Sequence, residues 1–330
     1  MKAALSKLLN IRAEDVAPSS EVAIHFPEGR LAFPVKVEAL APGMIAEEWI
    51  KKNFGLFESS LDKRGAILLR GFGIDSVQRF GTFMAGFDQP LLEYRQRSSP
   101  RFEVAKNVYH STTYPADQSI KMHSENSYAS EWAGRIVFCC IEPADVQGET
   151  PIADNRLVLD NLTSELREKF LRKGVRYVRN MSPGIGLQWQ EVFQTQDRGA
   201  VEKECEAGGM AFEWGGEDRL SLSWTTPAMR EHPRTGEMLW FNHGYFFNKY
   251  ALPEEALASF RSDEDLAFNT YFGDGTEISK DEIDAVGEAY RQATVVFPWR
   301  KGDVLYLDNM LMAHGRMPYE GNRKIIVSML

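Results

Sequence analysis

The chain has 330 residues, 43% of them hydrophobic and 12% aromatic, which excludes a disordered protein and a disulfide-stapled miniprotein. Aspartate and glutamate outnumber lysine and arginine by 47 to 38, for a formal net charge of −9. Because an acidic surface repels phosphate groups, this charge argues against nucleic acid and anionic membranes as partners.

The first third of the chain predicts a mixture of helix and strand. Apolar residues recur at helical spacing over 45–61, and Gly65 ends that pattern. A short buried strand is predicted over 66–69, and a second helix is predicted to begin after Asp75 as its N-cap. We therefore expect a helix-rich section over about residues 1–120.

The middle of the chain contains more strand signals. The apolar run 136–141 predicts a buried strand, and 175–178 and 220–224 predict two more. A short helix is predicted over 164–173, with Gly174 just past its end.

The last part of the chain begins with a capping box at 279–282, which predicts the start of a helix. Strands are then predicted over 294–297, 303–307 and 324–330, with a turn at 301–302. The chain therefore ends in a series of short strands.

These elements together predict the fold class. Short strands with Gly- and Pro-rich connections are typical of a mainly β jelly roll with helical additions (α+β), and regular βαβ alternation is missing. The sequence shows neither an internal repeat nor a linker between two halves, so we expect a single domain over 1–330. It also lacks the GxGxxG and GxxxxGK[ST] motifs, which argues against dinucleotide and P-loop sites.

The cysteine content bears on the compartment. The three cysteines, Cys139, Cys140 and Cys205, form no CxxC motif, which favours a reducing environment without a disulfide framework. The longest strongly apolar run is too short to span a membrane, and the first residues show no signal-peptide pattern. We expect a cytoplasmic protein.

The candidate chemistry starts from one H-x-[DE] triplet, His123-Ser124-Glu125. Residues two apart in a strand point to the same face, so His123 and Glu125 can share one metal ion. Taken alone, such a triplet is expected about once by chance in this composition, and a surface pair is the alternative interpretation. His314, which follows the apolar strand predicted over 303–307, is a candidate for the third ligand.

Two histidines and a carboxylate form the facial triad of non-heme Fe(II) oxygenases. The triad leaves three coordination positions open, two for an α-keto acid and one for O₂. An arginine is then needed for the distal carboxylate of the keto acid, because its planar fork matches that group. Arg323 and Lys324 lie shortly after His314 and are candidates.

Several ordered motifs resemble the TauD/TfdA family of Fe(II)/2-oxoglutarate-dependent oxygenases, and most closely its SyrP-like branch, which includes amino-acid hydroxylases of natural-product pathways. The resemblance runs from about residue 60 to the end of the chain. It rests on HSENSY at 123–128, GETPIAD at 148–154, Asp308-Asn309, AHGR at 313–316, LLRGF at 68–72, KGVRY at 173–177 and Trp299 followed by Gly302-Asp303.

The resemblance implies a double-stranded β-helix of the clavaminate synthase-like kind, with Fe(II) held by His123, Glu125 and His314. Glu125 departs from the aspartate that is commoner in the family but offers the same oxygen donor. The presence of a carboxylate argues against the halogenase variant, in which halide takes that position.

The resemblance also implies two residues for the co-substrate 2-oxoglutarate. Thr150 matches the threonine that hydrogen-bonds it, and Arg323 matches the arginine that pairs with its distal carboxylate. Lys324 and Arg316 stay open as alternatives for the second role.

Substrate contacts are assigned more loosely, to Asn126, Asn242 and Arg316. Asn126 is equally suited to forming a turn, and Arg316 to an ordinary salt bridge. Asn242 and His243 lie in an aromatic-rich segment that either borders the substrate or packs in the core with one satisfied histidine.

The implied activity is hydroxylation of an unactivated C–H bond, driven by O₂ and by oxidative decarboxylation of 2-oxoglutarate to succinate and CO₂. The implied substrate is a small molecule, an amino acid either free or carried as a thioester on a carrier protein. The same chemistry also gives desaturation, epoxidation or cyclisation. Two other classes remain open, a zinc hydrolase and a non-catalytic jelly-roll binding protein.

Overall fold

A computed structural model describes residues 21–87, 103–112, 114–216 and 218–330. Within them a large and a small β-sheet pack face to face and form a jelly roll, which confirms the predicted fold class. The large sheet consists, in spatial order, of β1 (Val22–His25), β2 (Val35–Ala39), β3 (Ala66–Arg70), β17 (Val304–Asp308), β7 (Arg135–Glu142), β20 (Lys324–Met329), β5 (Val108–His110) and β4 (Glu103–Ala105).

The small sheet carries the chemistry described below. Its strands, in spatial order, are β16 (Thr294–Val295), β9 (Ile152–Asp154), β18 (Met312–Arg316) and β6 (Ile120–His123). Ile152 and Met312 from this sheet pack in one buried cluster with Phe138 and Leu305 from the large sheet, so the space between the sheets is a hydrophobic core.

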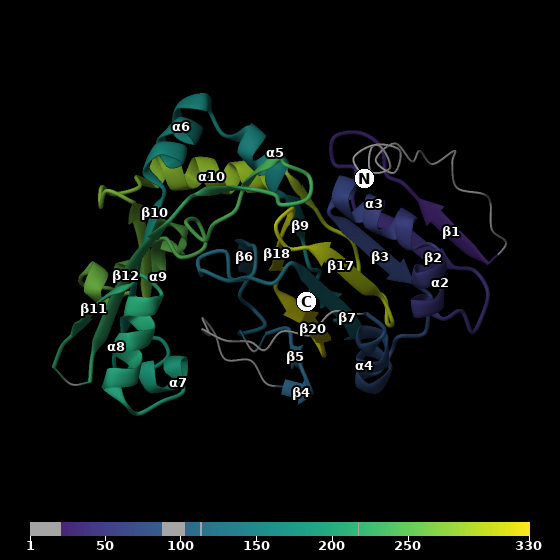
Figure 1. Cartoon of the computed structure of the whole chain (residues 1–330), viewed down its shortest axis with the longest axis horizontal. Helices are drawn as coiled ribbons and strands as arrows, with labels where there is room; N and C mark the ends of the chain where they lie inside the picture. Colours follow the sequence, from purple (N-terminus) through teal and green to yellow (C-terminus); the bar gives the residue numbers. More distant parts are fainter. Residues whose placement is uncertain (1–20, 88–102, 113, 217) are drawn as a thin grey trace.

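The large sheet has a buried cluster on each face, because side chains alternate along its strands. Leu68 and Phe138 point into the jelly roll, whereas Ile67 and Val137 point the other way. The second face is covered by α2 (Ala46–Lys52), α3 (Phe54–Arg64) and α4 (Val77–Ala85), as Figure 1 shows.

The buried cysteines follow the same alternation. Cys139 lies in the outer cluster and Cys140 in the inner one, and both are free thiols, as is Cys205. Burial raises the pKa of Cys140 to about 12. Two cysteines on opposite faces of one strand cannot pair, so they act as core residues.

The first part of the chain differs from prediction in two details. The helix predicted over 45–61 is two helices, α2 and α3, which meet at Asn53. Ser76 rather than Asp75 caps α4, because the Ser76 side chain accepts a hydrogen bond from the Arg79 amide. The end of α3 is confirmed at Gly65, whose φ of 71° is a conformation that glycine adopts readily.

The described part of the section before residue 120 holds strands as well as helices. The strands β1 to β5 all join the large sheet, with β2 pairing in parallel with β3. That section is therefore an integral part of the jelly roll.

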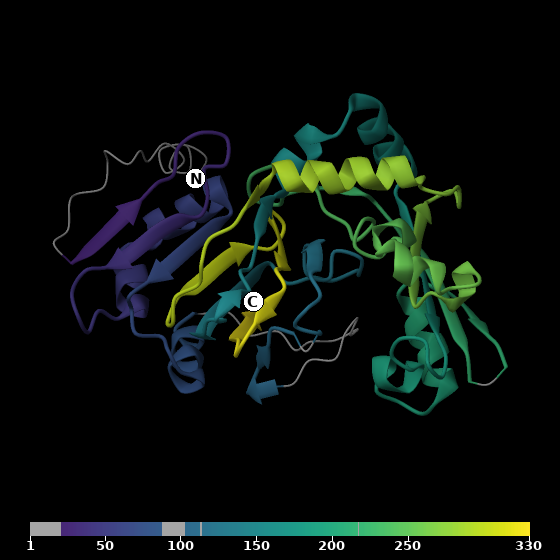
Figure 2. The same ribbon diagram turned by 180° about the vertical axis from the view of Figure 1, so that it is seen from behind.

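A long segment between β9 and β16 builds a second lobe beside the jelly roll (Figures 1 and 2). Its sheet has the order β11-β12-β10-β15. The elements of the segment are α5 (Asn155–Asn161), α6 (Ser164–Lys173), β10 (Val175–Met181), α7 (Trp189–Phe193), α8 (Arg198–Ala207), β11 (Ala211–Trp214), β12 (Leu220–Thr226), β13 (Met229–Glu231), β14 (Met238–Trp240), the 3₁₀ turn Lys249–Ala251, α9 (Glu254–Ala258), the 3₁₀ turn Asp263–Asp265, β15 (Phe268–Phe272) and α10 (Lys280–Gln292).

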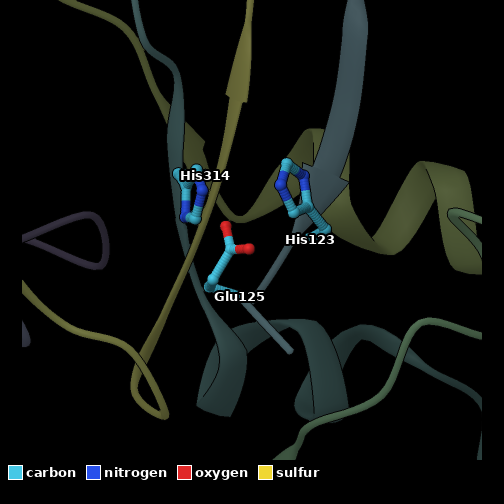
Figure 3. Close-up of side chains that lie close together, drawn as sticks. All are labelled: His123, Glu125 and His314. Atoms are coloured by element: carbon cyan, nitrogen blue, oxygen red, sulfur yellow. The ribbon is translucent and has the colours of Figure 1, made fainter. Parts of the chain in front are cut away.

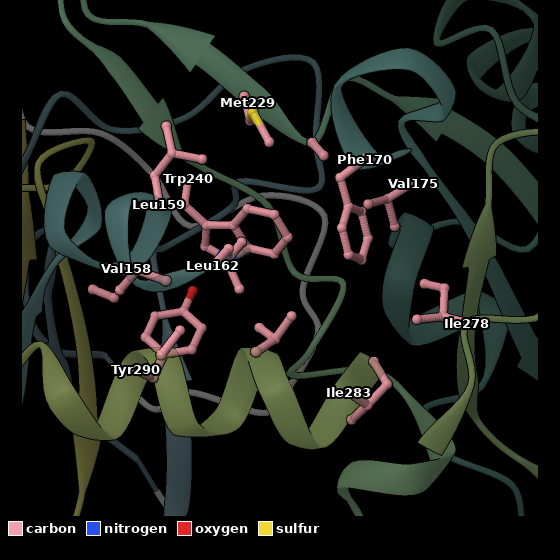
Figure 4. Packing of buried hydrophobic residues seen from close by; sticks show 14 of the residues in the cluster. Val158, Leu159, Leu162, Phe170, Val175, Met229, Trp240, Ile278, Ile283 and Tyr290 are labelled. Carbon is pink, nitrogen blue, oxygen red and sulfur yellow. The ribbon is translucent and has the colours of Figure 1, made fainter. Parts of the chain in front are cut away.

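The lobe is joined to the jelly roll by a continuous apolar core (Figure 4). Ile283 and Tyr290 of α10 pack against Trp240 and Phe170, and the same cluster includes Ala313 of β18. Local signals placed two of these helices correctly, since α6 covers the predicted residues and α10 has the predicted capping box.

The C-terminal strands are confirmed with one difference. The strand predicted over 294–297 is reduced to β16, two residues that pair with Ile152 and Ala153. Pro298, which follows shortly, has no amide proton to extend the pairing. None of the helices in the described ranges combines the length and apolar character needed to cross a bilayer.

Candidate metal centre

The three predicted metal ligands come together in the structure. His123 ends β6 and His314 lies on β18, and the two are direct partners across the antiparallel pair. One ligand atom from each of His123, Glu125 and His314 lies within 4.8 Å of the other two. Figure 3 shows the Glu125 carboxylate pointing into the space between the imidazoles.

Strand alternation predicted that Glu125 lies on the same strand as His123, but Glu125 lies beyond the end of β6. The chain leaves β6 at His123 and turns, with the Ser127 amide donating to the Ser124 carbonyl. The turn buries the Glu125 carboxylate against the histidines, with 3% of the residue exposed. Glu125 therefore approaches His123 and His314 through a turn of the chain rather than through the alternation of side chains along a strand.

The ring orientation of His123 suits metal binding. Its Nδ1 lies 2.8 Å from the Lys121 carbonyl oxygen. A carbonyl only accepts, so Nδ1 carries the proton and the lone pair is on Nε2. Phe246 and Phe138 pack against the rings of His123 and His314, at centroid distances of 4.6 and 5.0 Å. Two imidazoles and a carboxylate are the donor set that fits Fe(II).

A residue to which the sequence assigned no role fixes the position of Glu125. Asn309 is fully buried; its Oδ1 accepts from the Glu125 amide, and its Nδ2 donates to the Glu125 and Ala133 carbonyls. Its neighbour Asp308 is also buried and accepts from Arg135. In the sequence, both belong to the motifs that resemble the TauD/TfdA family and follow a predicted strand, but neither signal assigned them a role.

The two residues expected to bind 2-oxoglutarate are in contact. Arg323 precedes β20, and its Nη2 donates to Thr150 Oγ1 at 3.3 Å while its Nε donates to the Gly148 carbonyl at 2.7 Å. Trp299 Nε1 donates to the same threonine oxygen at 3.1 Å. Burial, and then the charge of nearby Arg316, lower the pKa of Arg323 to about 10.

The alternative cation Lys324 lies away from this contact. It is opposite Glu142 in the register of β20 with β7, on the face of β20 that also carries the outward-facing Ile326. Its charge adds to burial in lowering the pKa of His110. The structure thus brings Arg323, and not Lys324, to Thr150.

Arg316 lies on β18 two residues after His314 and is 3% exposed. Its guanidinium donates to the carbonyls of Tyr114, Pro115 and Gln118. Burial lowers its pKa. Within the described residues, Arg316 therefore holds three main-chain carbonyls rather than forming a salt bridge, one of its two predicted roles, and its charge lies close to Arg323.

Asn242 and Asn126 show different environments. Asn242 Nδ2 donates to the Ala228 carbonyl and its Oδ1 accepts from the Gly244 amide, so both groups shape the local backbone. Asn126 has a φ of 55°, a conformation that asparagine tolerates in turns. Its Oδ1 is buried and accepts no hydrogen bond from the described part of the chain.

His243 is the satisfied core histidine of the aromatic-rich segment. Its Nδ1 lies 2.7 Å from Ser127 Oγ, and its amide donates to the Tyr177 hydroxyl. Burial, and then nearby His123, hold the pKa of His243 well below its ordinary value. A neutral imidazole thus packs beside the metal ligands.

Comparison with protein families gives a match over most of the chain. The model described as "Taurine catabolism dioxygenase TauD, TfdA family" matches residues 36–329. The dapdiamide synthesis protein DdaC of Enterobacter agglomerans is 38% identical over 273 residues, which cover 82% of this chain and 83% of DdaC. A clavaminate synthase-like protein of Arabidopsis thaliana is 29% identical over 293 residues, covering 85% and 86% of the two chains.

Solved structures share the fold at low sequence identity. PvcB from Pseudomonas aeruginosa superposes with a TM-score of 0.55 and 15% identity, over 97% of this chain and 94% of PvcB. A taurine dioxygenase from Burkholderia xenovorans gives 0.53 and 14%, over 94% and 89%. The jelly roll described above is therefore the clavaminate synthase-like fold.

Proposed function

The chain belongs to the TauD/TfdA family of Fe(II)/2-oxoglutarate-dependent oxygenases, and from this we propose that it hydroxylates an unactivated C–H bond of an amino acid or aminoacyl group in natural-product biosynthesis. The biosynthetic context is supported by DdaC, which is named as a dapdiamide synthesis protein. The substrate is either free or held on a carrier protein, in line with the SyrP-like resemblance.

His123, Glu125 and His314 are proposed to hold the iron. The observation that carries this assignment is the convergence of their ligand atoms within 4.8 Å, on strands that pair at the two histidines. When bound, Fe(II) with 2-oxoglutarate and O₂ inserts one oxygen atom into the substrate and places the other in succinate, with release of CO₂. The protein holds the ligands rigidly on one sheet and its adjoining turn.

Thr150 and Arg323 are proposed to bind the distal carboxylate of 2-oxoglutarate. The guanidinium already donates to Thr150, and a carboxylate entering there would accept from both groups. Burial makes these hydrogen bonds stronger because water competes less. The nearby charge of Arg316 adds to the attraction for an anion.

The outcome of the reaction depends on which substrate atom is placed beside the metal. Desaturation, epoxidation and cyclisation stay within the same oxygenase chemistry. The zinc-hydrolase and non-catalytic alternatives do not fit a chain of this enzyme class. The contact between Arg323 and Thr150 supports a keto-acid site rather than a water-activating one.

The metal assignment is tested by adding Fe(II) and 2-oxoglutarate anaerobically. We expect a weak visible charge-transfer band in the wild-type protein, lost in His314→Ala and kept in His25→Ala, which changes a histidine of β1 with a 54% exposed side chain. A wild-type protein without the band, or a His314→Ala variant that keeps it, overturns the assignment.

The substrate is tested by succinate release in air over free amino acids and carrier-bound aminoacyl groups. Hydroxylation adds one oxygen to the product mass, which separates it from desaturation and cyclisation. Succinate formation that no member of either group stimulates rejects the proposed substrate class.

A further inference from the structure

A cavity of about 230 Å³ lies between residues 128–130, which follow Glu125, and the second lobe. The lining includes residues 128–130, Arg179 of β10 and Trp224 of β12. The volume is far larger than the roughly 30 Å³ that one water molecule occupies. It is below the roughly 300 Å³ at which pockets for drug-sized ligands begin, so it suits a group the size of an amino acid.

Two arginines line the cavity. Arg179 is 5% exposed, and its guanidinium lies over the Phe268 ring. Arg230 stacks on Trp132 at 4.6 Å, and its Nε is buried without a hydrogen-bond partner in the described residues. A carboxylate ligand would satisfy the donor that is otherwise buried at a cost.

Negative charge lies on another part of the lining. Glu204 belongs to the last turn of α8, and Gly208 is the C-cap residue of that helix. Both residues line the cavity. The carbonyl end of a helix carries partial negative charge and favours cations. The cavity therefore offers guanidinium groups for a carboxylate, and a carboxylate with a helix end for an ammonium group.

Tyr128, which lines the cavity, belongs to the segment that follows the proposed ligand Glu125. Trp224 Nε1 donates to the Tyr128 carbonyl at 2.8 Å, which joins the second lobe to the turn after Glu125. The Tyr128 ring packs on His243 at 4.8 Å, and His243 packs on His123 at 5.5 Å. The Tyr128 and His243 rings therefore lie between the cavity lining and the proposed metal ligand His123.

We propose that this cavity binds the α-carboxylate and α-ammonium groups of a free amino acid, with Arg179 and Arg230 on the carboxylate and Glu204 on the ammonium. This inference rests on the proposed function and narrows it. An aminoacyl thioester has no free α-carboxylate, so the two arginines favour the free amino acid over the carrier-bound form.

The test is anaerobic equilibrium dialysis of the protein with Fe(II) and 2-oxoglutarate against a panel of proteinogenic and non-proteinogenic L-amino acids, quantified by mass spectrometry. We expect at least one amino acid to be retained, and its amide and N-acetyl derivative to bind at least about tenfold more weakly, as the loss of one charged contact predicts. Retention of no amino acid, or equal binding of acid and amide, overturns the proposal.

Substitutions test which residue binds the carboxylate of the amino acid and which binds its ammonium group. Arg230→Gln should weaken binding of the acid about tenfold or more and abolish its preference over the amide, whereas Arg230→Lys should keep part of that preference. Arg176→Gln is the control, because Arg176 is an arginine of the second lobe, on β10, that does not line the cavity. Glu204→Gln should reduce discrimination against the N-acetyl derivative, and Glu206→Gln on the same helix should not.

The outcomes separate this proposal from the proposed function. Dialysis is repeated without metal and 2-oxoglutarate, and the charge-transfer band is recorded in parallel. A missing band with intact amino-acid binding contradicts the metal assignment alone. A normal band with Arg230→Gln binding like the wild type contradicts the cavity proposal alone.

Discussion

Asn309 binds the main chain of Glu125 on both sides of the residue, from 184 positions away in the sequence. Its side-chain oxygen accepts from the Glu125 amide at 2.8 Å, and its nitrogen donates to the Glu125 carbonyl at 2.9 Å. The turn that carries the proposed carboxylate ligand is therefore held by the residue that follows β17.

Replacing Asn309 should weaken both the fold and the metal site. Asn309→Ala leaves buried groups of Glu125 and Ala133 without partners, and we expect a loss of about 2 kcal/mol or more in the free energy of unfolding. Iron affinity should fall about 10- to 100-fold, as for other residues that orient metal ligands. Urea unfolding and anaerobic Fe(II) titration measure the two effects.

Asn161→Ala is the control, since Asn161 donates to the Ala289 carbonyl in the second lobe. It should leave iron affinity unchanged. If Asn309→Ala also binds iron like the wild type, Asn309 does not position the ligand.

Arg323 and Lys324 should differ sharply in their effect on 2-oxoglutarate. Removing a charge-assisted bidentate contact costs about 1.5–3 kcal/mol, so Arg323→Gln should raise the dissociation constant of 2-oxoglutarate about 10- to 150-fold. Lys324→Gln should change it less than about threefold, because that side chain lies on the other face of β20. Anaerobic titration of the charge-transfer band checks both, and a larger effect of Lys324→Gln would reverse the assignment.

Gly148 offers an indirect way to move Arg323. Its φ is 75°, and a Cβ there would lie 3.1 Å from Arg323 Cδ and 2.9 Å from Ala144 Cβ. Gly148→Ala should therefore weaken 2-oxoglutarate binding severalfold without changing iron affinity. Gly184→Ala is the matched control, with a similar φ of 86° and open space around it. Equal effects of the two substitutions would show that backbone strain alone is responsible.

Stability should fall in alkaline solution because buried phenols must stay neutral. Burial raises the pKa of Tyr177 from 10.0 to about 12. Between these values the unfolded chain has lost a proton that the folded chain retains, so the free energy of unfolding falls as pH rises. The stabilisation is present in full below pH 10, and between pH 10 and pH 12 it declines by about 1.4 kcal/mol per pH unit.

Urea unfolding between pH 8 and pH 11 measures this slope, with tyrosinate absorbance as a second readout. Tyr177→Phe has no group to ionise and should show a shallower decline than the wild type. If Tyr177→Phe and the wild type showed the same decline with pH, Tyr177 would ionise equally in the folded and unfolded protein.

Local sequence signals predicted part of the fold well. The capping box at Ser279 and the glycine after α6 both define helix ends through contacts within a few residues, so they can be read without tertiary structure. The break between α2 and α3 at Asn53 was missed, because the apolar spacing continues across it. The parallel pairing of β2 with β3 was also missed, since it depends on contacts between segments far apart in the chain.

For the site as well, the sequence predicted some features and missed those that depend on contacts between distant parts of the chain. Residue types and their order along the chain predicted His123, Glu125 and His314, which the structure brings together. The role of Asn309 could not be read, because a buried amide that satisfies a distant main chain leaves no periodic pattern. The charged cavity depends on a sheet and a helix that meet only in the folded second lobe.

The pairing of β16 with β9 has a consequence for how this enzyme can diversify. Thr294 lies opposite Ala153, so the segment 155–293 leaves the jelly roll and returns to it at neighbouring points. The residues proposed for iron and for 2-oxoglutarate all lie outside that segment, whereas Arg179, Glu204 and Arg230 lie within it. Substitutions within the segment can therefore reshape the proposed amino-acid cavity while the residues proposed for iron and 2-oxoglutarate stay the same, provided that the apolar core shared with the jelly roll is kept.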